Sequence, residues 1–257
     1  MTRQWLRYTI SAIVFYLVFL VVTAPAVWTA WALVRFTHGM ASLNETEGTI
    51  WHGRGDLVIH AGSAPPQRLG VIRWSVNPLW GFVGKVGVYA HLSGPDAGVE
   101  GNLRLGYRRL ALSGLTASFP AQLAASIYSP LGLLSPSGQV RVDSKTISID
   151  RAGIHGSAIV QWQGAGSSLS SVRPLGDYRL HFDGHGKTAA IRLEPVSGDL
   201  QVSGQGTWQL GSGQFHFSGI AKPTAQATEL EPLLRMIGPD TGAGERHITV
   251  NTIIKSP

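Results

Sequence analysis

Apolar side chains follow two different spacings along this chain, one at its start and another through the rest. From Tyr8 to Val34 the sequence carries no charged residue, and Arg3 and Arg7 precede this run. Because about 20 apolar residues are enough to cross a bilayer core, we predict a transmembrane helix over residues 8–34. Beyond it, apolar and polar residues alternate in short segments, which is typical of strands with one buried face.

The charges beside the apolar run predict its orientation. Arg3 and Arg7 lie before the run and Arg35 after it, and the flank with more Lys and Arg stays in the cytoplasm. We therefore predict a cytoplasmic tail over residues 1–7 and a periplasmic domain over residues 36–257. The amphipathic rings near the two ends of the run, which favour the membrane interface, are Trp5, Tyr8, Trp28 and Trp31.

A cleaved signal peptide is the alternative interpretation of the same run. Ala24-Pro25-Ala26 resembles a small-residue cleavage site. The apolar part of a signal peptide is about 7–15 residues long, whereas this run continues beyond Pro25 to Leu33. We therefore favour an uncleaved anchor.

The alternating segments predict a mainly β domain. They cover residues 86–92, 103–112, 140–142, 147–149, 178–182, 191–193, 200–210 and 215–217. Predicted turns between them lie at Asp143-Ser144-Lys145, Asp183-Gly184 and Gly211-Ser212-Gly213. Gly204 and Gly206 suggest a bend or bulge inside one strand. Short connections of this kind indicate an antiparallel meander that forms one curved β-sheet.

One or two short helices interrupt the strands. Leu230, Leu233, Leu234 and Ile237 share one helix face, after Thr228 as a cap and before Gly238-Pro239 as a stop. A weaker helical pattern over residues 120–128 lies about midway, so the domain could consist of two β halves divided near residues 120–136. Trp51-His52-Gly53 and Trp162-Gln163-Gly164 could then be equivalent points of a degenerate repeat.

Composition narrows the possible functions. The chain has no cysteine, so the domain needs a hydrophobic core without disulfide support. Its net charge is +6, to which Arg3 and Arg7 contribute, and the remaining basic residues are scattered. A nucleic-acid groove would cluster Lys and Arg with aromatic residues between them. We therefore expect no nucleic-acid partner.

No motif argues for catalysis, a cofactor or a metal. Gly184-His185-Gly186-Lys187-Thr188 ends like a phosphate-binding loop, but His181 stands where that motif needs its first glycine. His181, Asp183 and His185 are possible metal ligands, but the predicted Asp183-Gly184 turn would separate the two histidines. The carboxylates are few and lie mostly at turns, namely Asp56, Asp96, Asp143, Asp183 and Asp199. We predict no catalytic, cofactor-binding or metal-binding residue, no small-molecule substrate and no enzyme.

The tryptophans of the domain are the remaining candidates for binding. Each of them either fills the core or contacts a partner, since tryptophan is frequent at binding hot spots. They are Trp51, Trp74, Trp80, Trp162 and Trp208. We expect most of them in the core. Trp80, within Pro78-Leu79-Trp80-Gly81, is the candidate for an exposed contact.

Several short motifs together resemble a known family. After the apolar run come Gly48-Thr49-Ile50-Trp51-His52-Gly53 and Trp74-Ser75-Val76-Asn77-Pro78-Leu79. Leu175-Gly176-Asp177-Tyr178, a strand pair over residues 198–219 and a short helix near the carboxyl end follow. In content and order, these elements resemble type II secretion system protein N, the general secretion pathway protein N of Gram-negative bacteria. The similarity covers essentially the whole chain.

This resemblance implies a single-pass inner-membrane protein that acts as an accessory subunit of the type II protein secretion machinery. That machinery exports folded proteins from the periplasm through an outer-membrane secretin. The implied partners are the secretin and the inner-membrane assembly-platform proteins, with no cofactor. The strand over residues 247–254 could pair with a partner by its free edge.

Two other functions remain open from the residues. One is an AsmA-like periplasmic lipid-handling protein, which would hold acyl chains in an apolar groove along a curved sheet. An open groove would favour that function, and a filled core would favour a scaffold. The other is a periplasmic enzyme acting on glycan or peptide, which would need converging carboxylates in a polar cleft.

Overall fold

The computed structural model describes residues 2–60, 65–77, 86–127, 135–225, 227–240, 242 and 244–253. The helices in this part of the chain are α1 (Thr2–Val22), α2 (Val27–Phe36), α3 (Ala121–Ile127) and α5 (Ala227–Ile237). The first seven strands are β1 (Ala41–Gly48), β2 (His52–Ile59), β3 (Gln67–Asn77), β4 (Val86–Ser93), β5 (Gly98–Gly106), β6 (Arg109–Pro120) and β7 (Ser137–Asp150). The other six are β8 (Gly153–Gly166), β9 (Gly176–Gly186), β10 (Thr188–Ser197), β11 (Leu200–Gln209), β12 (Gln214–Pro223) and β13 (Arg246–Ile253).

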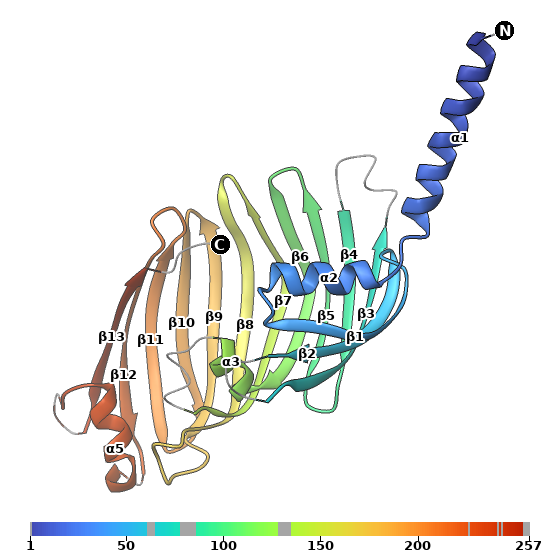
Figure 1. Ribbon diagram of the computed structural model, residues 1–257. Helices are drawn as coiled ribbons and strands as arrows, with labels where there is room; N and C mark the ends of the chain where they lie inside the picture. The colour runs from blue at the N-terminus through green and yellow to red at the C-terminus, as the bar shows by residue number, and fades with distance from the viewer. Residues whose placement is uncertain are drawn as a thin grey trace.

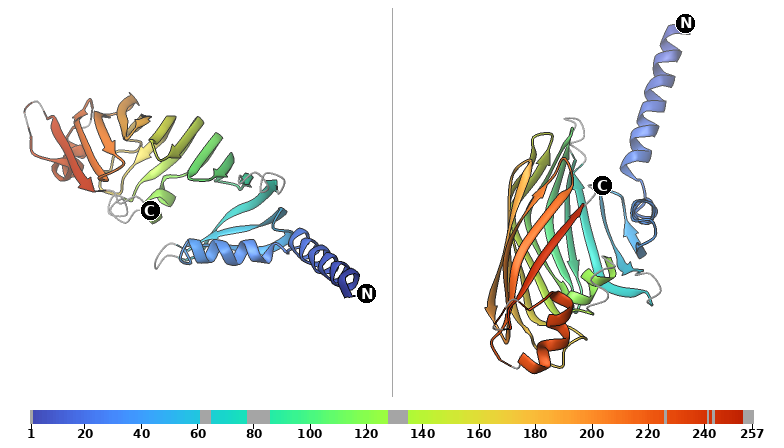
Figure 2. Two further views of the ribbon diagram at one scale, coloured as in Figure 1. Left: turned by 90° about the horizontal axis from the view of Figure 1, so that it is seen from above. Right: turned by 90° about the vertical axis from the view of Figure 1, so that its left-hand side faces the viewer.

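The strands form a single antiparallel meander, as the alternating sequence predicts. Thirteen strands lie in one sheet in the order in which they occur along the chain. The sheet is strongly curved, and β1 and β2 turn across the front of the molecule (Figures 1 and 2). α3 lies between β6 and β7 in the sequence, and these two strands pair with each other, so the sheet continues past residues 121–136.

The amino-terminal apolar run forms two helices instead of the single predicted one. α1 ends at Val22 and α2 begins at Val27. Pro25, which has no N–H to donate, lies in the break and forms an isolated bridge with Thr49. The backbone N–H of Ala26 donates to the Gly48 carbonyl at 3.1 Å. Pairing with the sheet therefore replaces helix continuation at this point.

α1 rises away from the sheet, and α2 runs across its direction, packed against β1 (Figure 1). Among the residues that the structure describes, no helix combines the length and the apolar character needed to cross a membrane.

The predicted turn at Asp143-Ser144-Lys145 is wrong, because β7 continues through it. The registers of β7 with β8 shift between Asp143 and Thr146, so the polar residues form an irregularity inside the strand. Ser144 is buried there, and its hydroxyl donates to the Ser157 carbonyl at 2.7 Å. A strand that is paired on both sides keeps its backbone hydrogen bonds by bulging, whereas a turn would lose them.

The predicted hairpin turn at Asp183-Gly184 is also wrong. Asp183 pairs with Ser157 of β8 and Ala190 of β10, so it lies within the strand. The chain turns instead at Gly186 and Lys187, where Gly186 has a φ of 75°. Glycine adopts this left-handed conformation without the strain that a side chain causes.

Gly204 and Gly206 create no bulge, since β11 keeps an unbroken register with both neighbours. Their role is to make room for an aromatic ring. A Cβ atom on Gly204 would lie 2.6 Å from Cζ of Phe217, which belongs to β12. The predicted turn after β11 and the two predicted short helices are confirmed.

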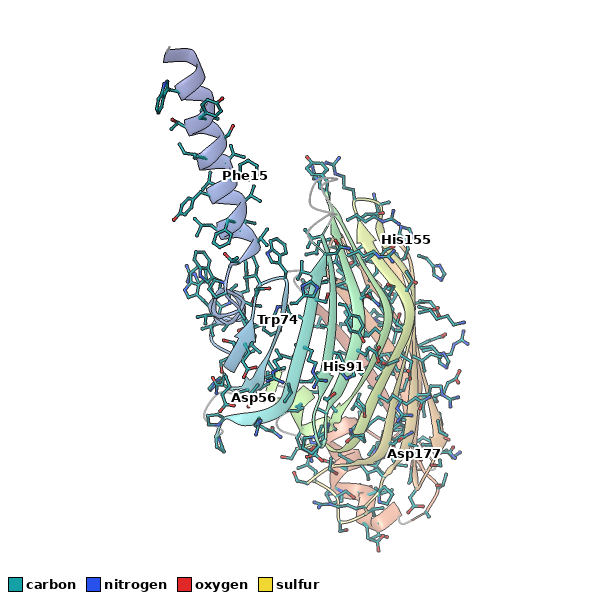
Figure 3. The ribbon with its side chains drawn as sticks, turned by 90° about the vertical axis from the view of Figure 1, so that its right-hand side faces the viewer. Phe15, Asp56, Trp74, His91, His155 and Asp177 are labelled. Carbon is teal, nitrogen blue, oxygen red and sulfur yellow. The ribbon has the colours of Figure 1, made fainter. Side chains whose placement is uncertain are left out.

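Directly paired residues point to the same face of the sheet, so the strand registers assign each side chain to one of two faces. These two faces differ in chemistry. The inner face is defined as the face that carries Leu200, Val202 and Ala221, against which α5 packs. α3 lies on the same side, and the sheet curves around it (Figure 2). The outer face carries mostly polar side chains, among them His155, which projects from the outer side of the curve (Figure 3).

Candidate interaction surfaces

Trp51 joins α1 to the first strands, and Trp74 packs between β3 and β2. The indole N–H of Trp51 donates to the carbonyl of Val21, the penultimate residue of α1, at 2.8 Å. Trp74 is buried on the inner face, opposite Gly53 on β2. A Cβ atom on Gly53 would lie 2.3 Å from Cζ2 of this ring. The glycine is therefore needed for the close approach of the tryptophan.

A second cluster forms around Asp177 at the start of β9. One carboxylate oxygen accepts the backbone N–H of Gly164 at 2.7 Å, and the other accepts the Ser197 hydroxyl at 2.8 Å. The buried Tyr178 donates its hydroxyl to the Leu200 carbonyl at 2.7 Å. Burial raises the pKa of the Tyr178 hydroxyl well above its usual range. This tyrosine therefore stays neutral and serves as a hydrogen-bond donor between β9 and β11.

The tryptophan–glycine motifs have different surroundings. Trp162 donates its indole N–H to the Ser137 carbonyl at 2.9 Å and lies 6.0 Å from the Tyr178 ring, centre to centre. Trp51 instead bonds to the end of α1. Trp74 confirms the expectation of a core residue, whereas Trp51, Trp162 and Trp208 are half-buried. Trp80 lies outside the described residues.

α5 fills the inner face at the carboxyl-terminal end of the sheet. Leu230 and Leu234 are almost completely buried against Leu200 and Ala221 of the sheet. The apolar spacing that predicted the helix is therefore the face that packs. Pro232 lies inside the helix, within its first turns.

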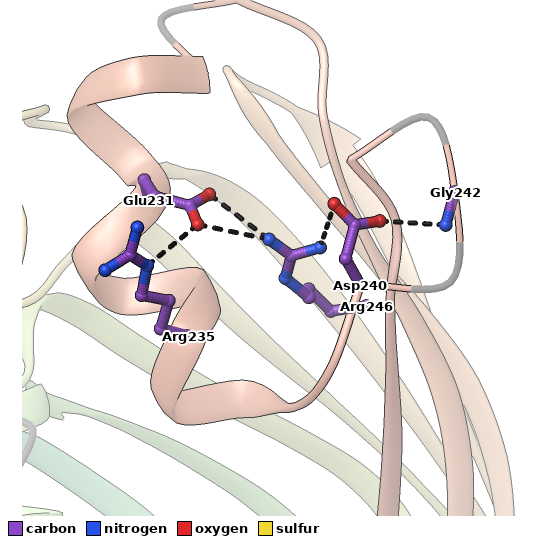
Figure 4. Close-up of polar contacts among 5 residues, drawn as sticks. All are labelled: Glu231, Arg235, Asp240, Gly242 and Arg246. Carbon is purple, nitrogen blue, oxygen red and sulfur yellow. Dashed lines mark hydrogen bonds and ion pairs between the residues drawn. The ribbon is translucent and has the colours of Figure 1, made fainter.

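A group of ion pairs connects α5 to the edge strand β13 (Figure 4). We call this group the α5 clamp, and it consists of Glu231, Arg235, Asp240 and Arg246. Arg246 of β13 is only 4% exposed. Its guanidinium lies 2.6 Å from Oδ2 of Asp240 and 3.2 Å from Oε2 of Glu231. Arg235 also contacts Glu231, at 3.0 Å. The hydrogen bond to Arg246 lowers the pKa of the Asp240 carboxyl.

β13 is one of the two edge strands of the sheet, because it pairs only with β12 among the described strands, and Asp240 forms an isolated bridge with Arg246 at its start. Val250 and Ile253 of this strand are 41% and 66% exposed. The expected edge over residues 247–254 is therefore confirmed as far as Ile253, and Ile254 lies outside the described residues. An unpaired strand edge with apolar side chains can accept a strand from a partner.

The residues considered as metal ligands lie together on the outer face. His181, Asp183 and His185 all belong to β9 at alternate positions, so the turn that was expected to separate them is absent. Within the described ranges, no three His, Asp or Glu residues are arranged to hold a metal ion. His181 is 3.8 Å from Glu194 across the strand pair. Lys187 and Gly186 form the β9–β10 turn, without a helix to follow them as a phosphate-binding loop requires.

The outer face has hollows between its side chains. One hollow of about 770 Å³ is lined by Tyr89, Asn102, Arg104 and Ser148, among others. Tyr89 donates its hydroxyl to Glu100 at 2.8 Å, which raises the pKa of the tyrosine. Another hollow of about 430 Å³ includes His181 and Asp183. The carboxylate of Asp56 is paired with Arg68 at 2.7 Å.

The α5 clamp and the bridging role of Asp177 were not predicted from the sequence. Arg246, Asp240 and Glu231 are separated by loops in the sequence, so no spacing rule brings them together. The alternation of apolar residues was a usable signal for the inner face. It required the register of every strand, which only the pairing supplies.

The residues that suggested a family therefore lie in structural positions, around Trp74 and around Asp177. A family model described as type II secretion system (T2SS), protein N matches residues 40–249. Neither the search of curated proteins nor the search of solved structures found a significant match. The matched region includes both clusters and all strands except the last residues of β13. The chain thus belongs to the family of type II secretion system protein N.

Proposed function

We propose that this protein is a non-catalytic accessory subunit of the type II secretion machinery, anchored in the inner membrane with its β domain in the periplasm. Family membership supports an accessory role in type II secretion. The sheet supports an interaction function, because one of its edges is free and apolar at Val250 and Ile253. Partners would be the outer-membrane secretin and the assembly-platform proteins of the inner membrane.

The proposed anchor is α1. It includes the first half of the uncharged run from Tyr8 to Val34, and the length of that run supports the proposal because roughly 20 apolar residues cross a bilayer core. Its apolar side chains are exposed on every side of the helix, with Phe15 at 76%, Leu17 at 54% and Val18 at 53%. Exposure of such a surface to water costs free energy, and lipid would remove that cost by covering the surface.

The contacts of residues 21–26 with the domain support an uncleaved chain. Trp51 bonds to Val21, and Ala26 bonds to Gly48. Removal of the leader after Ala26 would break the first of these contacts. An anchor that stays in place would keep the first strands at the membrane surface.

The edge strand carries the proposed interaction, and photo-crosslinking tests it. A photoreactive amino acid at Val250, on β13, is expected to form adducts with the secretin or an assembly-platform protein in cells that secrete. His155 serves as the control position. It lies on the outer face of β8, a strand that is paired on both sides. Adducts are identified with antibodies against these named components.

Deletion of the gene supplies the functional measurement. Export of secreted enzymes is expected to fall and to recover when the wild-type chain is returned. Unchanged export, together with no adduct to any machine component at Val250, would contradict the proposed function.

The alternative of a lipid-handling protein depends on an open apolar groove. The apolar residues on the inner face of β4–β10 lead us to propose lipid binding only as an additional property of the same subunit. Against the enzyme alternative, Asp240 and Glu231, two carboxylates that the structure brings to one guanidinium, are both engaged by Arg246.

A further inference from the structure

The inner face of the sheet is apolar from strand to strand. Val86, Leu105, Leu110 and Ile149 are direct neighbours on β4, β5, β6 and β7, and we call them the upper row. A parallel row beneath it consists of Val88, Leu103, Leu112 and Ile147. Paired positions share a face, so both rows belong to one surface.

The same surface continues across the next three strands. Its residues there are Ile154, Ala158 and Val160 on β8, Leu180 and Phe182 on β9, and Ile191 and Leu193 on β10. At the usual strand spacing, the seven strands from β4 to β10 extend about 29 Å. One leaflet of a bilayer core is about 15 Å thick, so the surface is longer than an acyl chain in that leaflet.

The upper row of this surface is partly exposed, whereas Ile154 and Ala158 on β8 are buried. α5 covers the end formed by β11, β12 and β13. The upper row is 38%, 40%, 37% and 40% exposed, from Val86 to Ile149. Soluble monomers rarely leave a contiguous apolar patch of more than a few hundred Å² in water. An apolar occupant is therefore expected.

The chemistry of the surface favours an occupant without polar groups. Each strand from β4 to β10 is hydrogen-bonded to two neighbours, so its backbone has no free edge. The polar side chains at this face are already used, since Ser144 bonds to Ser157 and Tyr178 bonds to Leu200. An extended peptide lying here would leave its own N–H and C=O groups unpaired, at a substantial cost. A hydrocarbon chain has no such groups.

The upper row also lies toward the membrane anchor. The β5–β6 and β7–β8 turns point to the same side of the molecule as α1 (Figure 1). The upper row lies at the strand ends beside these turns, at Leu105, Leu110 and Ile149. An acyl chain that leaves the bilayer would therefore meet the upper row first, a step that rests on the proposed anchoring of α1.

We propose that the inner face of β4–β10 is a trough that binds the acyl chains of a membrane lipid, which enter over the upper row. The headgroup remains at the open end beside the turns, and the chains lie along the aliphatic rows. The trough is a property of the domain itself and does not depend on assembly with the secretin.

Neighbouring residues of β7 give a matched test, because Ile147 faces the trough and Ser148 faces outward. A photoreactive amino acid is placed at each position in the full chain and irradiated in native membranes before detergent is added. Since successive strand residues point to opposite faces, lipid-mass adducts are expected to be about tenfold more frequent at 147 than at 148. Leu110 and Ala111 of β6 repeat the comparison, so that one unfolded variant does not decide it.

The Ile149→Glu variant tests the entry point. Ile149 is already 40% exposed, so the fold should tolerate glutamate, which thermal unfolding verifies. Lipid adducts at Ile147 are expected to fall severalfold, since a carboxylate at the entrance must be desolvated when chains pass.

Equal lipid adducts at Ile147 and Ser148 would overturn the proposal, as would their absence at Ile147 and Leu110. A protein adduct at Ile147 without a lipid adduct would also overturn it, because a partner segment would then occupy the trough. Adducts at Val250 and export of secreted enzymes are measured separately, so a failure of the trough is distinguishable from a failure of the secretion function.

Discussion

At the scale of single residues, the family motifs act by close packing. Gly53 allows the ring of Trp74 to lie against β2, and Asp177 joins the Gly164 and Ser197 segments by two hydrogen bonds. Both oxygens of Asp177 are engaged by these bonds, so its carboxylate has a structural role.

We expect Gly53→Ala to destabilise the domain by about 1–3 kcal/mol, a typical cost of overpacking. The new methyl group would overlap the Trp74 ring, which is only 7% exposed and has little space to move. Thermal or urea unfolding measures the change. Gly87→Ala on β4 is the control, because a Cβ atom there meets nothing within 4 Å. Equal stability of the two variants would contradict this account.

At the scale of elements, α5 and β13 stabilise each other through both apolar and charged contacts. Leu230 and Leu234 pack on the inner face, while Arg246 of β13 holds Glu231 and Asp240. β13 has a strand partner on one side only. The α5 clamp therefore fastens the strand that we propose as the docking edge.

The α5 clamp predicts a pH dependence. The folded-state pKa of Asp240 lies below its ordinary value, which is about 3.9 in an unfolded chain. The Asp240–Arg246 pair therefore contributes stability above about pH 4, and this contribution is lost as the pH falls through the lower folded pKa. Arg246 is the charged group that contacts the Asp240 carboxyl, and Glu231 contacts the same guanidinium.

We expect the unfolding temperature of the wild type to fall more steeply below about pH 4 than that of Asp240→Asn. The asparagine variant lacks the titrating carboxyl and should be less stable near neutral pH. Thermal unfolding of the full chain in detergent at several pH values measures both. Parallel pH profiles for the two proteins would show that the pair has no part in stability.

At the scale of the whole molecule, a curved sheet is joined to an exposed apolar helix by a short break. α2 packs on β1 through one face, where Ala30 and Leu33 are half-buried. Trp28 and Trp31 lie on its other face, at 66% and 68% exposure. Exposed indole rings on a helix beside an anchor are typical of an interfacial helix, which lies about 5–10 Å into the headgroup boundary.

We therefore predict that α2 lies on the outer surface of the inner membrane. The chain has no cysteine, so Trp31→Cys gives a single labelling site for a fluorophore that responds to its surroundings. Its emission should shift to the blue in lipid vesicles and be quenched by spin-labelled lipids at shallow depth. Ser212→Cys, in the β11–β12 turn, is the control and should behave as if in water. Matching emission from both sites would contradict this placement.

Much of the fold could be predicted from local patterns. Alternation identified β4 and β11, and the spacing of Leu230, Leu233 and Leu234 identified α5, because each pattern reports the burial of one face. The predictions failed at Asp143-Ser144-Lys145 and at Asp183-Gly184. In both places residues with turn propensity are held in strands by neighbours on each side, so tertiary pairing overrides local preference.

The sequence by itself determined the mainly β meander and the family, because alternation, turn residues and short motifs are local features of the chain. The tertiary structure alone decided three matters. It ended α1 at Val22, since Ala26 and Pro25 bond to the sheet. It brought Glu231, Asp240 and Arg246 together from separate segments. It placed the apolar residues of β4–β10 on one open surface, because only the register of paired strands fixes which side chains share a face.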